Sequence, residues 1–326
     1  MTDTPDYHNL TPDFICDAVE SLGFRLDTGL LALNSYENRV YQFRAEDGKR
    51  YVVKFYRPHR WSDAQIEEEH AFTQELYDAE IPVSPPLRFG GKTLIHWHGH
   101  RFAAFDSQGG RAPELDNPDH LTQLGRLLGR IHMVGAARPF SHRPRIDIQS
   151  FGHEALATIL AAGYVPDYLR ARFEDVTRTL IRHCETIEQR VGNVERFRLH
   201  GDCHSGNVLW TPAGPHFVDF DDSRNGPAIQ DLWMLLSGSP EEMKQQFDAI
   251  LDGYEEFREF DWRERHLVEV LRALRLIHYS AWLSARWTDP AFPLAFPWFG
   301  HSRYWEEQSL TLHEQACKLE SILEDL

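Results

Sequence analysis

Polar and hydrophobic residues alternate through much of the first hundred residues, which is the pattern of strands with one buried face. These stretches are rich in β-branched and aromatic residues, and the turn signal Glu46-Asp47-Gly48-Lys49 separates two of them. Strands are predicted at residues 30–34, 39–44, 51–56, 93–97 and 101–105, with one more near residue 87. We expect them to form a five-stranded antiparallel sheet.

One helix interrupts the strand pattern. Ser62 is followed three residues later by Gln65, which is a capping-box signature. Apolar residues from Phe72 onward then repeat at helical spacing until Pro82. The first third of the chain therefore predicts a sheet with a single helix.

The remaining two thirds of the chain have helical spacing almost throughout. Leu121, Leu124 and Leu128 illustrate this spacing in the first helix beyond Gly109-Gly110. Helices are predicted at residues 119–132, 154–162, 168–191, 240–254, 264–286 and 305–323. A β-hairpin interrupts them, with strands at residues 208–210 and 217–218.

The change from strands to helices predicts an α+β, bilobal chain. A length of 326 residues is too great for most single compact cores and suits two lobes. We place the N-terminal lobe at residues 1–107 and the mostly helical C-terminal lobe at residues 108–326.

Composition excludes several classes of protein. The 50 acidic and 34 basic residues give a net charge of −16, which disfavours nucleic acid and anionic membranes as partners. The cysteines form no C-x-x-C pair, so neither a disulfide framework nor a structural zinc module is predicted. No apolar run is long enough to span a bilayer, and the first residues lack the pattern of a signal peptide. We expect a soluble, monomeric protein of the cytoplasm.

Two acidic residues and an amide flank the predicted hairpin. Asp202 and Asn207 have the spacing D-x-x-x-x-N, and Asp219 follows the second strand. Phosphoryl transfer needs a carboxylate that accepts the proton of an attacking hydroxyl, and oxygen ligands for the magnesium that bridges the phosphates. A single loop aspartate is usually a turn residue, but these three residues in this order around one hairpin favour a phosphotransferase.

Lys54 lies on a predicted strand whose alternation places it on the same face as Val52. This V-x-K arrangement puts an apolar surface under adenine and an ammonium group against the α- and β-phosphates. Alone, Lys54 would more often be a solvated charge at a sheet edge, but Asp202 downstream favours a nucleotide-binding role. Such a lysine needs a carboxylate on the next helix, and spacing alone does not choose between Glu68 and Glu69.

The segment from His200 to Asn207 resembles the catalytic loop of aminoglycoside and choline kinases, in which H-G-D replaces the H-R-D of ordinary protein kinases. From about residue 10 to residue 293, the sequence more closely resembles the stress response kinase A family, a group of bacterial Ser/Thr protein kinases. The segments that carry this resemblance are LNSYENRVY at 33–41, VVKFYRP at 52–58, LHGDCHSGN at 199–207 and NGPAIQDLW at 225–233.

This resemblance implies a role for each candidate residue, with ATP and Mg2+ as cofactors. Asp202 would accept the proton, and the glutamate paired with Lys54 would be Glu69. Asp231 would orient the catalytic loop through its backbone, and residues 105–110 would form a hinge. The candidate residues are Ser35, Lys54 and Glu69 for the nucleotide, Asp202 and Asp219 for catalysis, and Asn207 and Asp219 for the metal.

Three features are less certain from the residues. The loop 35–38 contains no glycine, so it is equally consistent with a phosphate-binding loop and with a plain turn that strains Asn38. Asp221 and Asp222 are interpreted as exposed loop acids outside the metal site. His200, Cys203 and His204 lack the companion ligands of a zinc site, so we expect them to shape the loop.

The leading hypothesis is an ATP-dependent Ser/Thr protein kinase, related to stress response, that also phosphorylates itself. Its partner would be a protein substrate. The main alternative is a kinase for a small hydroxyl acceptor such as an amino alcohol or an aminoglycoside, because only the acceptor pocket would differ. An inactive nucleotide-binding pseudokinase is disfavoured because Lys54, Asp202, Asn207 and Asp219 are all present.

Overall fold

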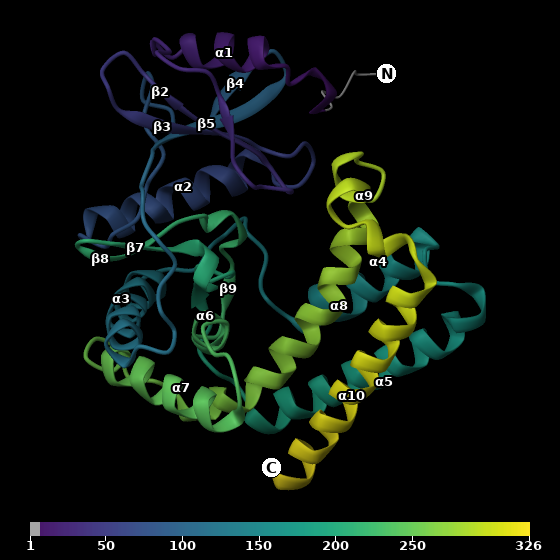
Figure 1. Cartoon of the computed structure of the whole chain (residues 1–326). Helices are drawn as coiled ribbons and strands as arrows, with labels where there is room; N and C mark the ends of the chain where they lie inside the picture. Colours follow the sequence, from purple (N-terminus) through teal and green to yellow (C-terminus); the bar gives the residue numbers. More distant parts are fainter. Residues whose placement is uncertain (1–6) are drawn as a thin grey trace. The chain divides into compact units, whose positions relative to one another are not determined.

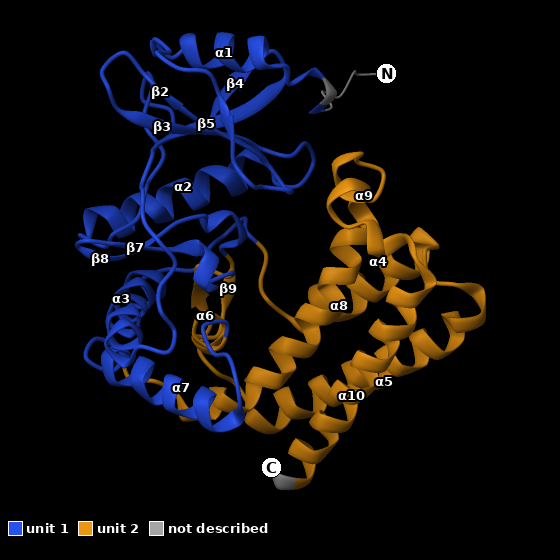
Figure 2. Ribbon diagram, in the orientation of Figure 1, with its two compact units in different colours: residues 1–143, 202–223, 234–258 blue, residues 144–201, 224–233, 259–326 orange. Residues whose placement is uncertain are grey.

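The computed structural model describes residues 7–326, which form two compact units (Figures 1 and 2). The first unit comprises the chain up to residue 143 together with residues 202–223 and 234–258. The second comprises residues 144–201, 224–233 and 259–326. The boundary expected after residue 107 lies inside the first unit, where the chain passes from sheet to helix.

The first unit contains a five-stranded antiparallel sheet in the order β1-β2-β3-β5-β4 (Figure 1), which confirms the predicted architecture. Near residue 87 the chain forms an isolated bridge between Pro86 and Phe105 rather than a strand. The strands are β1 (Leu31–Ala32), β2 (Arg39–Arg44), β3 (Arg50–Phe55), β4 (Ile95–Trp97) and β5 (His100–Asp106).

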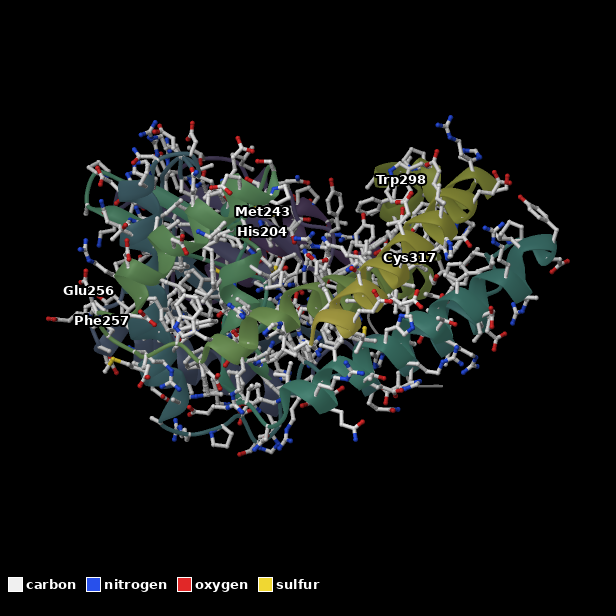
Figure 3. The ribbon with its side chains drawn as sticks, turned by 90° about the horizontal axis from the view of Figure 1, so that it is seen from below. His204, Met243, Glu256, Phe257, Trp298 and Cys317 are labelled. Atoms are coloured by element: carbon white, nitrogen blue, oxygen red, sulfur yellow. The ribbon has the colours of Figure 1, made fainter. Side chains whose placement is uncertain are left out.

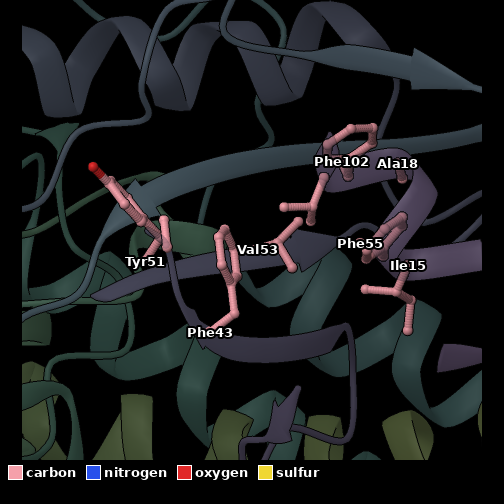
Figure 4. Close-up of a cluster of buried hydrophobic side chains, with 9 residues drawn as sticks. Ile15, Ala18, Phe43, Tyr51, Val53, Phe55 and Phe102 are labelled. Carbon is pink, nitrogen blue, oxygen red and sulfur yellow. The ribbon is translucent and has the colours of Figure 1, made fainter. Parts of the chain in front are cut away.

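One face of this sheet packs against a helix that the sequence analysis did not predict, α1 (Pro12–Glu20) (Figure 1). Figure 4 shows Phe43, Val53 and Phe55 of the strands beside Ile15 of α1 in one buried cluster. Because successive side chains of a strand point to opposite faces, Lys54 points away from this cluster. The expectation of a single helix beside the sheet was therefore wrong.

The helix α2 (Asp63–Asp78) begins at the predicted capping box. The Ser62 hydroxyl accepts the Gln65 N–H at 3.3 Å, and the Gln65 side chain accepts the Ser62 N–H at 2.8 Å. Phe72 and Leu76 are fully buried. The same buried side of α2 carries Glu69, which brings a carboxylate into the interior of the first unit.

The rest of the first unit contains two helices and the predicted hairpin. The elements are α3 (Pro118–Ala136), β7 (Val208–Thr211), β8 (Gly214–Phe217) and α7 (Pro240–Tyr254). Helices α3 and α7 pack against each other, with glycines at the contact. In the hairpin, Val208 pairs with Phe217 at the open end and Thr211 pairs with Gly214 at the turn. Asn207 and Asp219 therefore lie just beyond the open end of the hairpin.

The second unit is helical apart from the short pair β6 (Phe197–Arg198) and β9 (Asn225–Gly226). Its helices are α4 (Glu154–Ala162), α5 (Asp167–Val191), α6 (Ile229–Trp233), α8 (Val268–Arg286), α9 (Ala291–Ala295) and α10 (Ser302–Asp325). Helix α8 is shorter than the helix predicted at 264–286, because residues Trp262–Leu267 form a 3-10 turn before α8 begins. Among the described residues, no helix combines the length and the apolar character needed to cross a membrane.

Candidate active site

The loop that leads to Asp202 is held by a buried carboxylate. Asp231, in α6, has no exposed side-chain surface and accepts the N–H groups of His200 and Gly201, each at 2.8 Å. The Gln230 side chain donates to the carbonyl of Gly201 at 2.9 Å. A carboxylate that accepts two backbone N–H groups forms strong, charge-assisted hydrogen bonds. Asp231 therefore orients the backbone directly before Asp202, as the sequence implied.

Hydrogen bonds connect the three candidate residues around the hairpin. The Asn207 side-chain amide donates to the carbonyl of Asp202 at 2.9 Å, and the Asn207 carbonyl accepts the N–H of Val218 at 3.0 Å. Asp219 comes next and has a left-handed backbone with φ of 59°, which is uncommon outside glycine. The hairpin thus brings together residues that the sequence separates.

His204, labelled in Figure 3, folds back over the same loop. Its Nδ1 atom accepts the Gly206 N–H at 3.0 Å, so the proton of the neutral ring lies on Nε2, 3.5 Å from Oδ2 of Asp202. A Cβ at Gly206 would lie 2.7 Å from the imidazole. His204 is therefore placed to orient Asp202. Among the described residues, no cluster of three or more His, Cys, Asp or Glu has the arrangement of a metal site.

Lys54 is buried and forms ion pairs with two aspartates. Its Nζ atom lies 3.1 Å from Oδ1 of Asp219 and 3.1 Å from Oδ1 of Asp221. Burial alone would lower the pKa of Lys54, but the carboxylates of Asp219 and Asp221 outweigh burial and hold this pKa well above its usual value. The interpretation of Asp221 as an exposed loop acid was wrong, since only 4% of its surface is exposed.

The two glutamates considered as partners of Lys54 have different surroundings. Glu69 is buried and lines the same cavity as Lys54, but among the described residues the basic side chain at ion-pair distance is His70, with Nε2 at 3.8 Å, and burial lowers the pKa of His70 to about 3. The expected ion pair between Lys54 and Glu69 is therefore absent. Glu68, the other candidate, bonds to the backbone: its carboxylate accepts the N–H groups of His142 and Arg143, each at 2.9 Å.

Burial raises the pKa of Glu69 to about 7, against an ordinary value of 4.5, although the charges of Lys54 and Arg143 offset part of this rise. The folded protein therefore keeps this proton at pH values where the unfolded chain has lost it, so stability falls as the pH rises from 4.5 to 7. The full cost, present above pH 7, is roughly 3 kcal/mol.

Glu69→Gln should remove this cost. We expect the melting temperature of the variant to exceed that of the unmodified protein more at pH 8 than at pH 5, because the carboxyl is mostly neutral at the lower pH. Thermal melts of both proteins across this range test the prediction, and the other titrating groups cancel in the difference. A difference that does not change with pH would contradict it.

A cavity of about 340 Å³ in the first unit collects most of the candidate residues. Apolar side chains of the sheet, such as Val52 and Phe105, form one part of its wall, and Leu209 of the hairpin forms another. This volume and this mixture of apolar and polar groups are typical of a small-molecule site. The candidate residues that line it are Ser35, Lys54, Glu69, Asn207 and Asp219. Asp202 is not a lining residue, but its carbonyl is bonded to Asn207.

The donor atoms beside this cavity suit a magnesium ion. Asp219 presents a side chain that is 56% exposed, and among the described residues the Asn207 side chain bonds through its amide nitrogen, which leaves its side-chain oxygen for a ligand. Mg2+ in phosphoryl-transfer enzymes typically takes one or two protein oxygens, with phosphates and water completing its octahedral shell. Asn207 and Asp219 therefore fit a divalent ion that would bridge and neutralise the phosphates.

The loop 35–38 is fixed by side chains rather than strained. Asn38 is 3% exposed, and its side-chain oxygen accepts the Arg57 N–H at 3.1 Å. Asn38 is not among the described residues with positive φ, so the suggested strain at this position is absent. Ser35, which precedes these contacts, lines the cavity.

Comparisons with known proteins agree with this site. Residues 29–297 match the model of the phosphotransferase enzyme family, and the chain belongs to that family. Stress response kinase A from Salmonella choleraesuis (strain SC-B67) is 50% identical over 310 residues, which cover 95% of this chain and 94% of the relative. A serine/threonine protein kinase, RdoA, from Salmonella typhimurium is 49% identical over 310 residues, with the same coverage. The resemblance to stress response kinase A is thus confirmed, and the chain is a kinase.

One solved structure illustrates the shared fold. Amicoumacin kinase hAmiN, in complex with AMP-PNP, Ca2+ and Ami, has a TM-score of 0.68 and 18% identity to this chain. The alignment covers 90% of this chain and 92% of that one. At this identity the likeness supports the α+β fold.

Proposed function

We propose that this chain is an ATP- and Mg2+-dependent Ser/Thr protein kinase. The observation that carries the proposal is the grouping of Lys54, Asn207 and Asp219 around one cavity, with Asp202 bonded to Asn207. The names of the relatives at about half identity favour a protein acceptor.

In the proposed reaction, each residue acts on a stated atom. Lys54 contacts the α- and β-phosphates, and Ser35 donates its hydroxyl to a phosphate oxygen. Asn207 and Asp219 would supply oxygen ligands to Mg2+, which would neutralise charge on the phosphates. Asp202 accepts the proton of a serine or threonine hydroxyl while the oxygen of that hydroxyl forms a bond to the γ-phosphorus. The bond between that phosphorus and the bridging oxygen breaks, and ADP carries away the electron pair.

The segment after Asp219 is too short for a long activation loop. It forms a 3-10 turn at Phe220–Asp222 and the strand β9 before it reaches Asp231. Ordinary protein kinases order a longer segment at this point by phosphorylation. We propose that this site is assembled without such a switch and that the chain also phosphorylates itself in the cytoplasm as a monomer.

An acceptor assay tests the proposal. Purified protein is incubated with labelled ATP and Mg2+ alone, with a generic protein substrate, and with choline, homoserine or an aminoglycoside. We expect label on protein, including the kinase itself, and expect Asp219→Ala to abolish it, because that variant lacks a metal ligand. The matched control is Asp222→Ala, which removes a neighbouring carboxylate that is bonded to Arg60 rather than to Lys54.

Other results would redirect the assignment. Turnover with a small alcohol alone would identify a small-molecule kinase. Nucleotide binding without transfer to any acceptor would indicate a pseudokinase. Full activity of Asp219→Ala would contradict the metal site.

A further inference from the structure

Asp221 lies at the centre of a buried polar cluster in the first unit. Its Oδ1 atom lies 3.1 Å from Nζ of Lys54, and its Oδ2 atom accepts a hydrogen bond from the Asn38 amide at 3.1 Å. The Arg60 guanidinium donates to the same Oδ2 atom. One carboxylate therefore contacts the loop before β2, the lysine of β3, and the connection between β3 and α2.

The backbone around Asp221 is also held. Arg143, which is 3% exposed, donates to the carbonyl of Asp221 and, at 2.6 Å, to the carbonyl of Ser223. It donates further to the carbonyl of Gln65 in α2 at 2.9 Å, and its guanidinium lies 4.5 Å from the centre of the Trp61 ring. These contacts fix the position of Asp221 from both the backbone and the side-chain ends.

The same cluster fixes the glycine-free loop 35–38. The Glu37 carboxylate lies 3.1 Å from Nε of Arg57 and 3.5 Å from Nε of Arg60. Arg57 also donates to the carbonyls of Tyr36 and Glu37, at 3.1 and 2.9 Å. The loop 35–38 is therefore connected to the Asp221 carboxylate through Asn38 and Arg60. Lys54 contacts the same carboxylate.

The two other carboxylates near Lys54 are less suited to hold it. Asp219 is half exposed and contacts Lys54 through Oδ1, but as the proposed metal ligand it would share its charge between Lys54 and the metal. Glu69 is buried and has no cation at ion-pair distance among the described residues, because burial lowers the pKa of the neighbouring His70 to about 3. Asp221 is buried and is not a proposed metal ligand, so its contact with Lys54 would not compete with a metal.

We propose that Asp221 is the positioning residue of the nucleotide site: it holds Lys54 and the loop 35–38 in the arrangement that receives the phosphates, in place of a glutamate on α2. This inference rests on the proposed function, because it assumes that a nucleotide occupies the cavity. In this role Asp221 contacts neither the substrate nor the metal. Its effect should therefore appear in the part of nucleotide binding that needs no metal.

The test measures ADP affinity by calorimetry, once in EDTA and once in Mg2+. Asp221→Asn should weaken ADP binding about tenfold under both conditions, because an ion pair that orients Lys54 is lost. Asp219→Asn should weaken binding more in Mg2+ than in EDTA, because in Mg2+ it loses a metal ligand as well as its ion pair with Lys54. Asp222→Asn, the matched control, should stay within about threefold of the unmodified protein in EDTA.

A double-mutant cycle shows whether Asp221 acts through Lys54. If it does, Asp221→Asn should weaken ADP binding much less in a Lys54→Met background than alone. Additive effects would overturn the proposal, and so would an Asp221→Asn variant that binds ADP normally in EDTA. Circular dichroism and melting temperature report whether each variant is folded.

Two further outcomes keep the result decisive. If Asp221→Asn does not fold, Asn38→Ala takes its place, because it cuts the link between Asp221 and the loop, and it should weaken ADP binding in EDTA by severalfold. Normal binding by that variant would overturn the proposal.

The unmodified protein separates this inference from the proposed function. Normal ADP binding without phosphoryl transfer would refute the proposed function while leaving the role of Asp221 intact. Absence of ADP binding would refute both.

Discussion

Asp202→Asn is expected to lower kcat for phosphoryl transfer by about 10²- to 10⁴-fold, the usual contribution of a general base. Asparagine has nearly the same shape as aspartate, so the hydrogen bond from Asn207 to the backbone carbonyl of residue 202 should persist. An amide, however, cannot accept the proton that the attacking hydroxyl loses. The measurement is the initial rate of label transfer at saturating ATP and acceptor.

Nucleotide binding provides the control for this variant. Asp202 does not line the cavity, so Asp202→Asn should bind ADP within about threefold of the unmodified protein and melt at a similar temperature. A loss of kcat without a loss of ADP affinity assigns the residue to the chemical step. Unchanged kcat would remove Asp202 from its proposed role.

Gly125→Ala should destabilise the first unit more than any surface substitution. A Cβ at Gly125 would lie 1.9 Å from the carbonyl oxygen of Ile250, so α3 and α7 would have to move apart. Backbone atoms cannot rotate away as a side chain can, and overpacking of this kind costs on the order of 3 kcal/mol. We expect a fall in melting temperature of roughly 5–10 °C.

A graded set of glycine variants sharpens this test. Gly253→Ala should behave similarly, because its Cβ would lie 2.0 Å from the carbonyl oxygen of Thr122. Gly129→Ala should cost less, since its closest contact, the carbonyl oxygen of Tyr254, is at 2.7 Å. Gly29→Ala is the control: nothing lies within 4 Å of its Cβ and its φ is not positive. Equal melting temperatures for Gly125→Ala and Gly29→Ala would contradict the packing argument.

Sequence reasoning succeeded where structure depends on neighbouring residues. The capping box at Ser62 and Gln65 and the alternation around Lys54 are local signals, and both features are present. The helix α1 was not predicted although Thr11 caps it and Pro12 opens it, because a helix of 9 residues gives only a short run of helical spacing. Its burial depends on strands such as β2, which begins at Arg39, well beyond the end of α1 at Glu20.

The same contrast between local signals and contacts with distant residues applies to the candidate site. The proximity of Asp202, Asn207 and Asp219 could be predicted because they flank one hairpin, whose turn and strands are readable from the sequence. Asp221 was misjudged because its burial is created by residues such as Asn38 and Arg143, which lie far from it in the chain. Nothing in the local pattern separates a buried aspartate of this kind from an exposed one.

The absence of glycine from the loop 35–38 has a consequence for how a ligand enters the site. A glycine-rich loop samples many backbone conformations and must lose that freedom when it closes on phosphates. Here Asn38, Glu37 and their arginine partners remove the freedom when the chain folds. Little ordering is then left for the moment of association, so a ligand meets a preformed surface and the entropy of the loop no longer opposes binding.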